Sequence, residues 1–245
     1  MARFYISPAE WNVDRLVLEG GEAHHCLDVL RMQPGERLTV FNGLGVEATA
    51  EIGVVKKDRI ELKALQHART PPLRCEITLG QAVPKGKNME LIVEKATELG
   101  AASISPLLSD RTVVQCSASE AERKREKWQR VAIEAAKQCG QNWLPTVHTP
   151  LSMKTFFSSL GKFDLMLIAS LQGDARPLKK ILGELSAHPA RVLVLVGPEG
   201  DFTPAELSLA KSHGCLPMTL GPIVLRTETA AIYCVSVLSH ELLSA

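Results

Sequence analysis

From residue 75 onward, the chain alternates between short apolar runs and segments with helical patterns, and this alternation limits the folds open to it. An apolar run followed each time by an amphipathic or capped segment predicts a mainly parallel sheet covered by helices. The expected strands are Cys75–Val83, Ser103–Leu108, Phe163–Ala169, Val192–Val196 and Leu216–Leu220. The expected helices are Lys87–Leu99, Ser119–Cys139, Thr155–Leu160, Pro177–Leu185, Pro204–Ser212 and Ala230–Leu243.

The first 66 residues have a different pattern, with short β-rich runs separated by turn signals such as Asn42-Gly43. We expect a small β-barrel with one helix, Glu22–Leu30. The expected strands are Arg15–Leu18, Arg37–Phe41, Val46–Val55 and Arg59–Leu65. Two prolines in the segment 67–74 exclude a continuous helix or a central strand, so this segment is expected to be a linker. The sequence therefore predicts two domains, residues 1–70 and 75–245.

Composition narrows the class of protein. No apolar run approaches the roughly 20 residues of a membrane span, and the first residues lack a signal-peptide pattern. The six cysteines include no Cys-x-x-Cys pair, which favours reduced thiols in the cytoplasm. The net charge is +1, and residues 1–74 carry 10 basic and 10 acidic side chains. Any nucleic acid would therefore have to meet a local basic patch rather than a basic domain.

Three stretches imitate known binding motifs. Residues 43–48 fit a loose dinucleotide fingerprint, but a strand pattern follows them, so a hairpin turn is favoured. The side chains of His24-His25-Cys26 cannot easily coordinate one metal ion, because adjacent helical residues point about 100° apart. Residues 80–88 differ from a phosphate-binding loop in spacing and in having Asn88 where Ser or Thr is needed. Without a phosphate-binding fingerprint at the first strand-helix turn, a Rossmann oxidoreductase is also disfavoured.

Two Gly-Pro loops, residues 197–202 and 221–230, each leave a buried strand and enter a helix. Parallel sheets place ligands at such positions. Thr203 to Glu206 form a capping box, so Glu206 is expected to be structural. Glu199 projects from a tight loop, and on sequence alone a functional and a structural interpretation are equally supported. Arg226 stands at a helix N-terminus, where a cation is unfavourable, so either an anionic partner or an intramolecular carboxylate should face it.

Several pieces, taken together and in this order, are similar to one family. The pieces are Pro84–Glu90, Lys95–Gly100, Glu134–Gly140, Gly197–Gly200, Leu220–Pro222 and Leu225–Ala230. The chain resembles, over nearly its whole length, the bacterial 16S ribosomal RNA uridine-N3 methyltransferases of the knotted SPOUT class. The resemblance implies a PUA-like barrel that holds RNA, a carboxy-terminal trefoil knot, a homodimer and S-adenosylmethionine bound in the knot loops. Asp201 stands where the family usually has glycine, and Ile223 where it often has a polar or basic residue.

The candidate site residues form three groups: the resemblance implies the cofactor-binding group, the chemistry of methyl transfer suggests the catalytic group, and a local basic stripe is nominated for RNA. The cofactor-binding residues would be Leu171, Gln172, Gly173, Gly197, Pro198, Glu199, Gly200, Leu220, Gly221, Ile223, Leu225, Thr229 and Ala230. The catalytic candidates are Arg226, which could stabilise the uracilate oxygens, and Glu199 and Glu228, which could act as the general base. The RNA-binding candidates are Arg3, Arg31, Lys85, Lys87 and Arg111. Methyl transfer to uracil N3 needs no metal.

Two other functions stay open from the sequence. The first is a SPOUT methyltransferase that modifies transfer RNA or a ribose 2′-hydroxyl. The second is an RNA-binding assembly factor with a degenerate cofactor pocket, against which the intact Gly197, Gly200, Gly221 and Arg226 argue. The apolar surface of the last helix must be covered on most sides, either within the monomer or by a partner chain.

Overall fold

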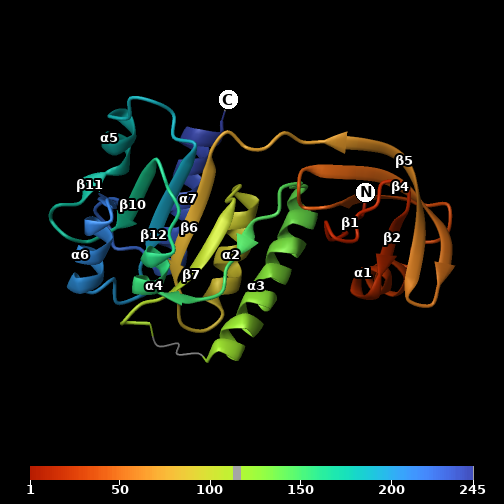
Figure 1. Cartoon of the computed structure of the whole chain (residues 1–245), viewed down its shortest axis with the longest axis horizontal. Helices are drawn as coiled ribbons and strands as arrows, with labels where there is room; N and C mark the ends of the chain where they lie inside the picture. The colour runs from red at the N-terminus through yellow and green to blue at the C-terminus, as the bar shows by residue number, and fades with distance from the viewer. Residues whose placement is uncertain (113–116, 245) are drawn as a thin grey trace. The chain divides into compact units, whose positions relative to one another are not determined.

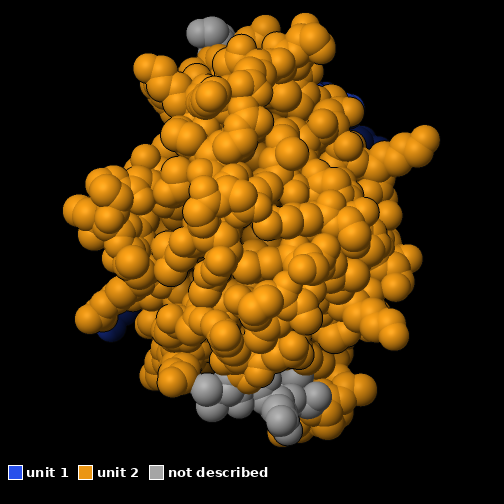
Figure 2. All heavy atoms as spheres, turned by 90° about the vertical axis from the view of Figure 1, so that its left-hand side faces the viewer, with its two compact units in different colours: residues 1–72, 133–144 blue, residues 73–132, 145–245 orange. Residues whose placement is uncertain are grey.

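The computed structural model describes residues 1–112 and 117–244 (Figure 1). The chain divides into two compact units, coloured separately in Figure 2. Unit 1 comprises residues 1–72 and 133–144, and unit 2 comprises residues 73–132 and 145–245. Within the described part of the chain, no helix has the length and apolar character needed to cross a membrane.

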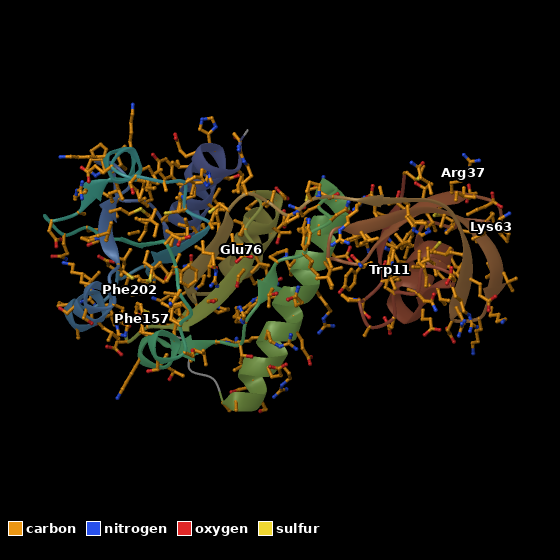
Figure 3. The ribbon with its side chains drawn as sticks, turned by 45° about the horizontal axis from the view of Figure 1, so that its top comes forward. Trp11, Arg37, Lys63, Glu76, Phe157 and Phe202 are labelled. Carbon is orange, nitrogen blue, oxygen red and sulfur yellow. The ribbon has the colours of Figure 1, made fainter. Side chains whose placement is uncertain are left out.

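Unit 1 is built on a five-stranded sheet in the order β1-β3-β4-β5-β2. Its strands are β1 (Arg3–Tyr5), β2 (Leu16–Glu19), β3 (Arg37–Phe41), β4 (Val46–Lys56) and β5 (Arg59–Arg69). Apolar side chains alternate inward along these strands and form one core, with Leu38, Val40, Ala48 and Ala50 fully buried. Trp11 packs partly buried against this core, whereas Arg37 and Lys63 are exposed (Figure 3).

Two predictions in unit 1 need correction. The expected linker begins later than predicted, because residues 67–69 continue β5 and pair with β4; the prolines that break the strand come only at positions 71 and 72. The expected single helix is an α-helix, α1 (Gly20–His24), followed by one π-helical turn, η1 (His25–Val29). In that turn the Leu30 N–H donates to the His25 carbonyl, five residues back. The loop at residues 43–45 is a hairpin connection, as expected.

Residues 133–144 belong to unit 1 although they follow the first strands of unit 2 in the chain. They form the end of helix α3 (Ala118–Cys139) and the loop after it. Lys137, with a side chain 7% exposed, pairs with Glu22 at 3.0 Å. The Trp143 indole N–H donates to the Thr70 carbonyl at 3.1 Å. These contacts join segments more than 70 residues apart, and no local pattern predicted them.

Unit 2 contains an eight-stranded sheet whose strand pairs are all parallel. The order is β11-β13-β10-β12-β6-β7-β8, with β9 also paired to β7. The strands are β6 (Glu76–Ala82), β7 (Ser103–Leu108), β8 (Thr146–Val147), β9 (Leu151–Ser152), β10 (Leu165–Ala169), β11 (Arg176–Pro177), β12 (Arg191–Val196) and β13 (Leu216–Thr219). The mainly parallel sheet is confirmed. The two-residue strands were not expected, because they are too short to give a periodic signal.

Helices cover both faces of this sheet (Figure 1). They are α2 (Asn88–Glu98), α3, α4 (Met153–Ser158), α5 (Leu178–Gly183), α6 (Pro204–Ser212) and α7 (Thr227–Leu243). Helices α2 and α7 pack together, and α7 lies against β6 and β12. On the other face, Phe157 and Phe202 lie near each other in one apolar core (Figure 3). Leu195 packs over Gly80, where an added Cβ would lie 2.4 Å from the leucine Cδ2.

The chain path at the carboxyl end places three loops together. After β12 the chain passes through α6 to β13, which pairs with β10 on the side away from β12. It then returns through residues 220–226 to α7, which lies against β6 and β12. Loops that follow β10, β12 and β13 therefore meet at one edge of the sheet.

Candidate functional site

A cavity of about 320 Å³ lies at the carboxyl ends of β10, β12 and β13, where parallel sheets bind ligands. Its size is within the range of small-molecule sites. Ionisable side chains at its wall are Glu199, Asp201 and Arg226. The other lining residues are Ala169, Ser170, Leu171, Val196, Gly197, Pro198, Thr219, Leu220, Gly221, Ile223, Val224, Leu225, Thr227 and Ala230.

The first Gly-Pro loop is held from two directions. The Lys85 backbone N–H donates to Glu199 Oε1 at 3.0 Å, and the Arg111 guanidinium donates to the Gly200 carbonyl. Asp201 has a φ of 61°, a conformation that suits glycine, and its Oδ1 accepts from the Phe202 N–H at 2.8 Å. Departures from favoured backbone geometry are typical of functional loops.

Helix α6 anchors the end of this loop through the capping box that the sequence predicts. Thr203 Oγ1 accepts from the Glu206 N–H at 3.3 Å, and the Glu206 carboxylate accepts from the Thr203 N–H at 2.8 Å. The same carboxylate also accepts from Ser109 Oγ at 3.1 Å and from the Asp110 N–H at 2.9 Å. Glu206 is only 6% exposed, so the structural interpretation of this residue is confirmed.

The second loop ends at Arg226, which occupies the N-cap position of α7. Its side chain makes no capping hydrogen bond to the helix. The Arg226 side chain is exposed, and no carboxylate among the described residues lies within ion-pair distance of it. The two carboxylates that could have paired with it have other partners: Glu199 accepts from Lys85, and Glu228 accepts from Asn88 Nδ2 at 3.3 Å. A cation without a carboxylate partner among the described residues therefore borders the cavity.

Thr227, the first residue of α7, does not cap the helix with its side chain. Its hydroxyl donates to the Gly197 carbonyl at 2.6 Å instead. A hydroxyl turned toward another loop cannot reach back to the amide groups of its own helix.

The predicted site residues divide between the cavity wall and its surroundings. Most of the cofactor candidates line the cavity, together with Arg226. Five candidates are not part of the wall, namely Gln172, Gly173, Gly200, Glu228 and Thr229. The wall also includes residues that sequence reasoning did not propose as site residues: Ser170, Thr219, Asp201, Val224 and Thr227. Their positions in or next to the segments that follow β10, β12 and β13 were the available signal.

The RNA-binding candidates differ in solvent exposure and in their contacts with other side chains. Arg3 pairs with Glu47 at 2.8 Å and donates to Asn142, with a side chain 16% exposed, so most of its charge is used within unit 1. Arg31, Lys85 and Lys87 are exposed. Lys85 and Lys87 lie in the loop before α2 that contacts Glu199, next to the cavity.

A second cavity, of about 530 Å³, opens on the sheet at the amino ends of β6, β7 and β12. Its charged rim is an ion pair, Arg191 with Glu76, at 3.2 Å. Burial lowers the pKa of His148 in its wall, which favours the neutral imidazole. This cavity lacks the two Gly-Pro loops and Arg226, so the smaller cavity at the carboxyl ends is the candidate site.

Comparison with known proteins identifies the class of protein to which this fold belongs. Residues 71–239 match the RNA methyltransferase domain family, and residues 18–65 match the RNA methyltransferase PUA domain. With the strand order and the cavity described above, the chain has the fold of the SPOUT class of RNA methyltransferases, with a carboxy-terminal trefoil knot and an amino-terminal PUA-like domain.

Similarity to individual proteins identifies the family within this class. Ribosomal RNA small subunit methyltransferase E of Bacillus subtilis is 32% identical over 98% of this chain and 97% of its own length. The same enzyme of Neisseria gonorrhoeae, solved with S-adenosylmethionine, is 31% identical with a TM-score of 0.86 and covers 98% of both chains. A methyltransferase of Legionella pneumophila, also solved with S-adenosylmethionine, is 36% identical with a TM-score of 0.88, covering 98% of this chain and 97% of that chain. The chain belongs to the ribosomal RNA small subunit methyltransferase E family.

Proposed function

We propose that this protein transfers a methyl group from S-adenosylmethionine to N3 of a decoding-site uridine in 16S ribosomal RNA of the small subunit. The observation that carries the proposal is the cavity at the carboxyl ends of the sheet, where two carboxylates, two glycine loops and Arg226, which has no carboxylate partner among the described residues, meet. Family membership supports the same reaction class.

The residues of the cavity fit S-adenosylmethionine. At Gly221 the backbone has a φ of 120°, and an added Cβ would meet nothing within 4 Å, so the space beside this residue is open to a ligand. Glu199 and Asp201 at the wall suit a cofactor with a sulfonium charge. Gly197→Val tests the placement, since even the first added carbon would lie 3.2 Å from the Phe202 nitrogen. We expect loss of cofactor binding by calorimetry in a folded variant; retained affinity would mean that the site is misplaced.

When bound, the cofactor supplies an electrophilic methyl group. The residues of the chain must then hold uracil N3 in line with it, accept the N3 proton and exclude water. Arg226 lines the cavity, and in this proposal its guanidinium stabilises the negative charge that develops on the uracil oxygens. Glu199 lines the cavity and is the better placed of the two candidate bases, since Glu228 is turned toward Asn88. The target base must be unpaired or flipped out of its stack.

RNA binding would involve the PUA-like unit 1 together with basic side chains of both units. Of the candidates, Lys85, Lys87 and Arg111 lie on segments that form hydrogen bonds with the 197–201 loop. Within the chain, one face of α7 packs on α2, β6 and β12, while Tyr233 on the same helix remains 44% exposed. We therefore propose a homodimer that covers the rest of α7, in the cytoplasm. A fully active monomer in sedimentation at micromolar concentration would contradict the dimer.

Mass mapping of 16S ribosomal RNA after incubation with purified protein and labelled cofactor tests the function. Small subunits and free 16S RNA from a strain that lacks the modification are the two substrates, with transfer RNA as the competing substrate. We expect one new methyl group, on a uracil base. Label on transfer RNA or on a ribose would support the alternative methyltransferase, and absence of both cofactor binding and label would support an assembly factor.

A further inference from the structure

A buried glutamine interrupts the apolar interior beside the cavity. Gln81 lies near the carboxyl end of β6, a central strand, and its exposed fraction is 0%. Its Nε2 donates to the Ala82 carbonyl at 2.8 Å and to Thr227 Oγ1 at 3.0 Å. Strands buried on both faces of a parallel sheet are usually apolar, so an amide side chain at this position needs an explanation.

The hydrogen bonds continue from this glutamine to the start of α7 and then to the first Gly-Pro loop. Because the Gln81 amide donates to the Thr227 hydroxyl, that hydroxyl uses its own proton toward another acceptor. The acceptor is the Gly197 carbonyl, at 2.6 Å. Thr227 is 4% exposed, so water competes little for these bonds. The relay Gln81–Thr227–Gly197 thus runs in one direction, from the sheet through the helix to the loop.

The relay connects three segments that are distant in sequence. Gln81 and Thr227 are 146 residues apart, and Thr227 and Gly197 are 30 apart. Gln81 also stands opposite Val196 in the β6–β12 register, so it lies beside the point where the first loop leaves the sheet. Thr227 directly follows Arg226, so the relay fixes the start of α7 relative to the first loop.

Stability alone does not account for the glutamine. Its Oε1 is buried without a hydrogen-bond partner within the described part of the chain. An unsatisfied buried acceptor is destabilising, and an apolar side chain of similar shape would avoid that cost. We propose that Gln81 and Thr227 are positioning residues, which hold Arg226 and the Gly197 loop in the relative placement that methyl transfer requires. This inference rests on the proposed function.

The first test compares three threonine variants. Thr227→Val removes the relay hydroxyl and keeps the shape, Thr227→Ser retains a hydroxyl, and Thr97→Val is the matched control. Thr97 is also fully buried, and its hydroxyl donates to the Val93 carbonyl at 2.8 Å within α2. Single-turnover methyl transfer is measured at saturating RNA and cofactor, beside thermal melting. We expect Thr227→Val to be about 10- to 100-fold slower, since small misplacements cost that much. Thr227→Ser should stay within about threefold of wild type, and Thr97→Val should melt lower but react at the wild-type rate.

The second test is a double-mutant cycle with Arg226→Ala, which separates positioning from general destabilisation. If Thr227 acts through Arg226, Thr227→Val should slow the Arg226→Ala enzyme by less than about threefold. Gln81→Met should behave like Thr227→Val and replaces it if the valine variant does not fold. An equal loss in both backgrounds, or an equal loss in Thr97→Val, would overturn the inference while the proposed function stands. A wild-type rate in Arg226→Ala would overturn the catalytic role of Arg226 and this inference together.

Discussion

Replacing Arg226 by alanine separates a catalytic role from a structural one. A catalytic arginine should lower the rate of methyl transfer when it is removed and leave the melting temperature intact, whereas a structural arginine should lower the melting temperature. The side chain is exposed, makes no capping hydrogen bond to α7 and has no carboxylate partner within ion-pair distance among the described residues. Exposed substitutions of this kind change stability by about 0.5 kcal/mol or less. Removing a cation from a helix N-terminus even stabilises by about 0.3–1 kcal/mol. We therefore expect the melting temperature to stay constant or to rise by up to about 4 °C.

The chemical step should respond in the other direction. Loss of one preorganised charge-stabilising donor typically lowers the rate about 10²-fold, or about 2.7 kcal/mol. Arg226→Lys should recover only part of this, because an ammonium lacks the planar fork that meets two acceptors. Arg74, an exposed arginine of the same unit, provides the control variant Arg74→Ala. The assay is single-turnover transfer of labelled methyl at saturating RNA. Wild-type turnover, or a fall of several degrees in melting temperature, would refute the reasoning.

Three further predictions concern RNA affinity, pH and the fold. Lys85 and Lys87 are exposed beside the cavity, so changing both to glutamate should weaken RNA binding and lower its salt slope by about 2, whereas the same change at Lys179-Lys180 on α5 should not. Equal slopes from salt titrations of the two double variants would remove the first pair from the RNA surface. Burial lowers the pKa of His148 from its ordinary 6.5, so the unfolded chain binds the proton more tightly. The stability that His148 contributes is present above pH 6.5 and is lost as the pH falls through the lowered folded value; urea unfolding across this window should show a dependence that His148→Gln reduces. Glu206→Ala leaves two part-buried backbone N–H groups and a buried serine hydroxyl without their acceptor and breaks a capping box, so unfolding should become easier by about 3–5 kcal/mol. A loss below about 1 kcal/mol in denaturant titration would mean that water replaces the carboxylate.

The features that sequence predicted well depend on neighbouring residues. The capping box at α6 needs only four consecutive residues, from Thr203 to Glu206, so its chemistry is visible without a fold. The alternation of apolar runs and helical patterns predicted the parallel sheet because each strand and helix is encoded by its own periodicity. The two Gly-Pro loops were recognisable for the same reason, and they do lie at the carboxyl ends of the sheet.

Other features exist only once the chain has folded. The sequence by itself determined the kinds of elements, their order and the two loops, since these follow from local pattern and turn chemistry. The tertiary structure decided that residues 133–144 join unit 1, that Arg226 has no carboxylate partner within the described residues, and that Gln81 meets Thr227. Each of these depends on which distant segments the parallel sheet brings side by side. Hydrogen bonds across 146 residues leave no periodic trace, because their partners are chosen by strand order and not by spacing.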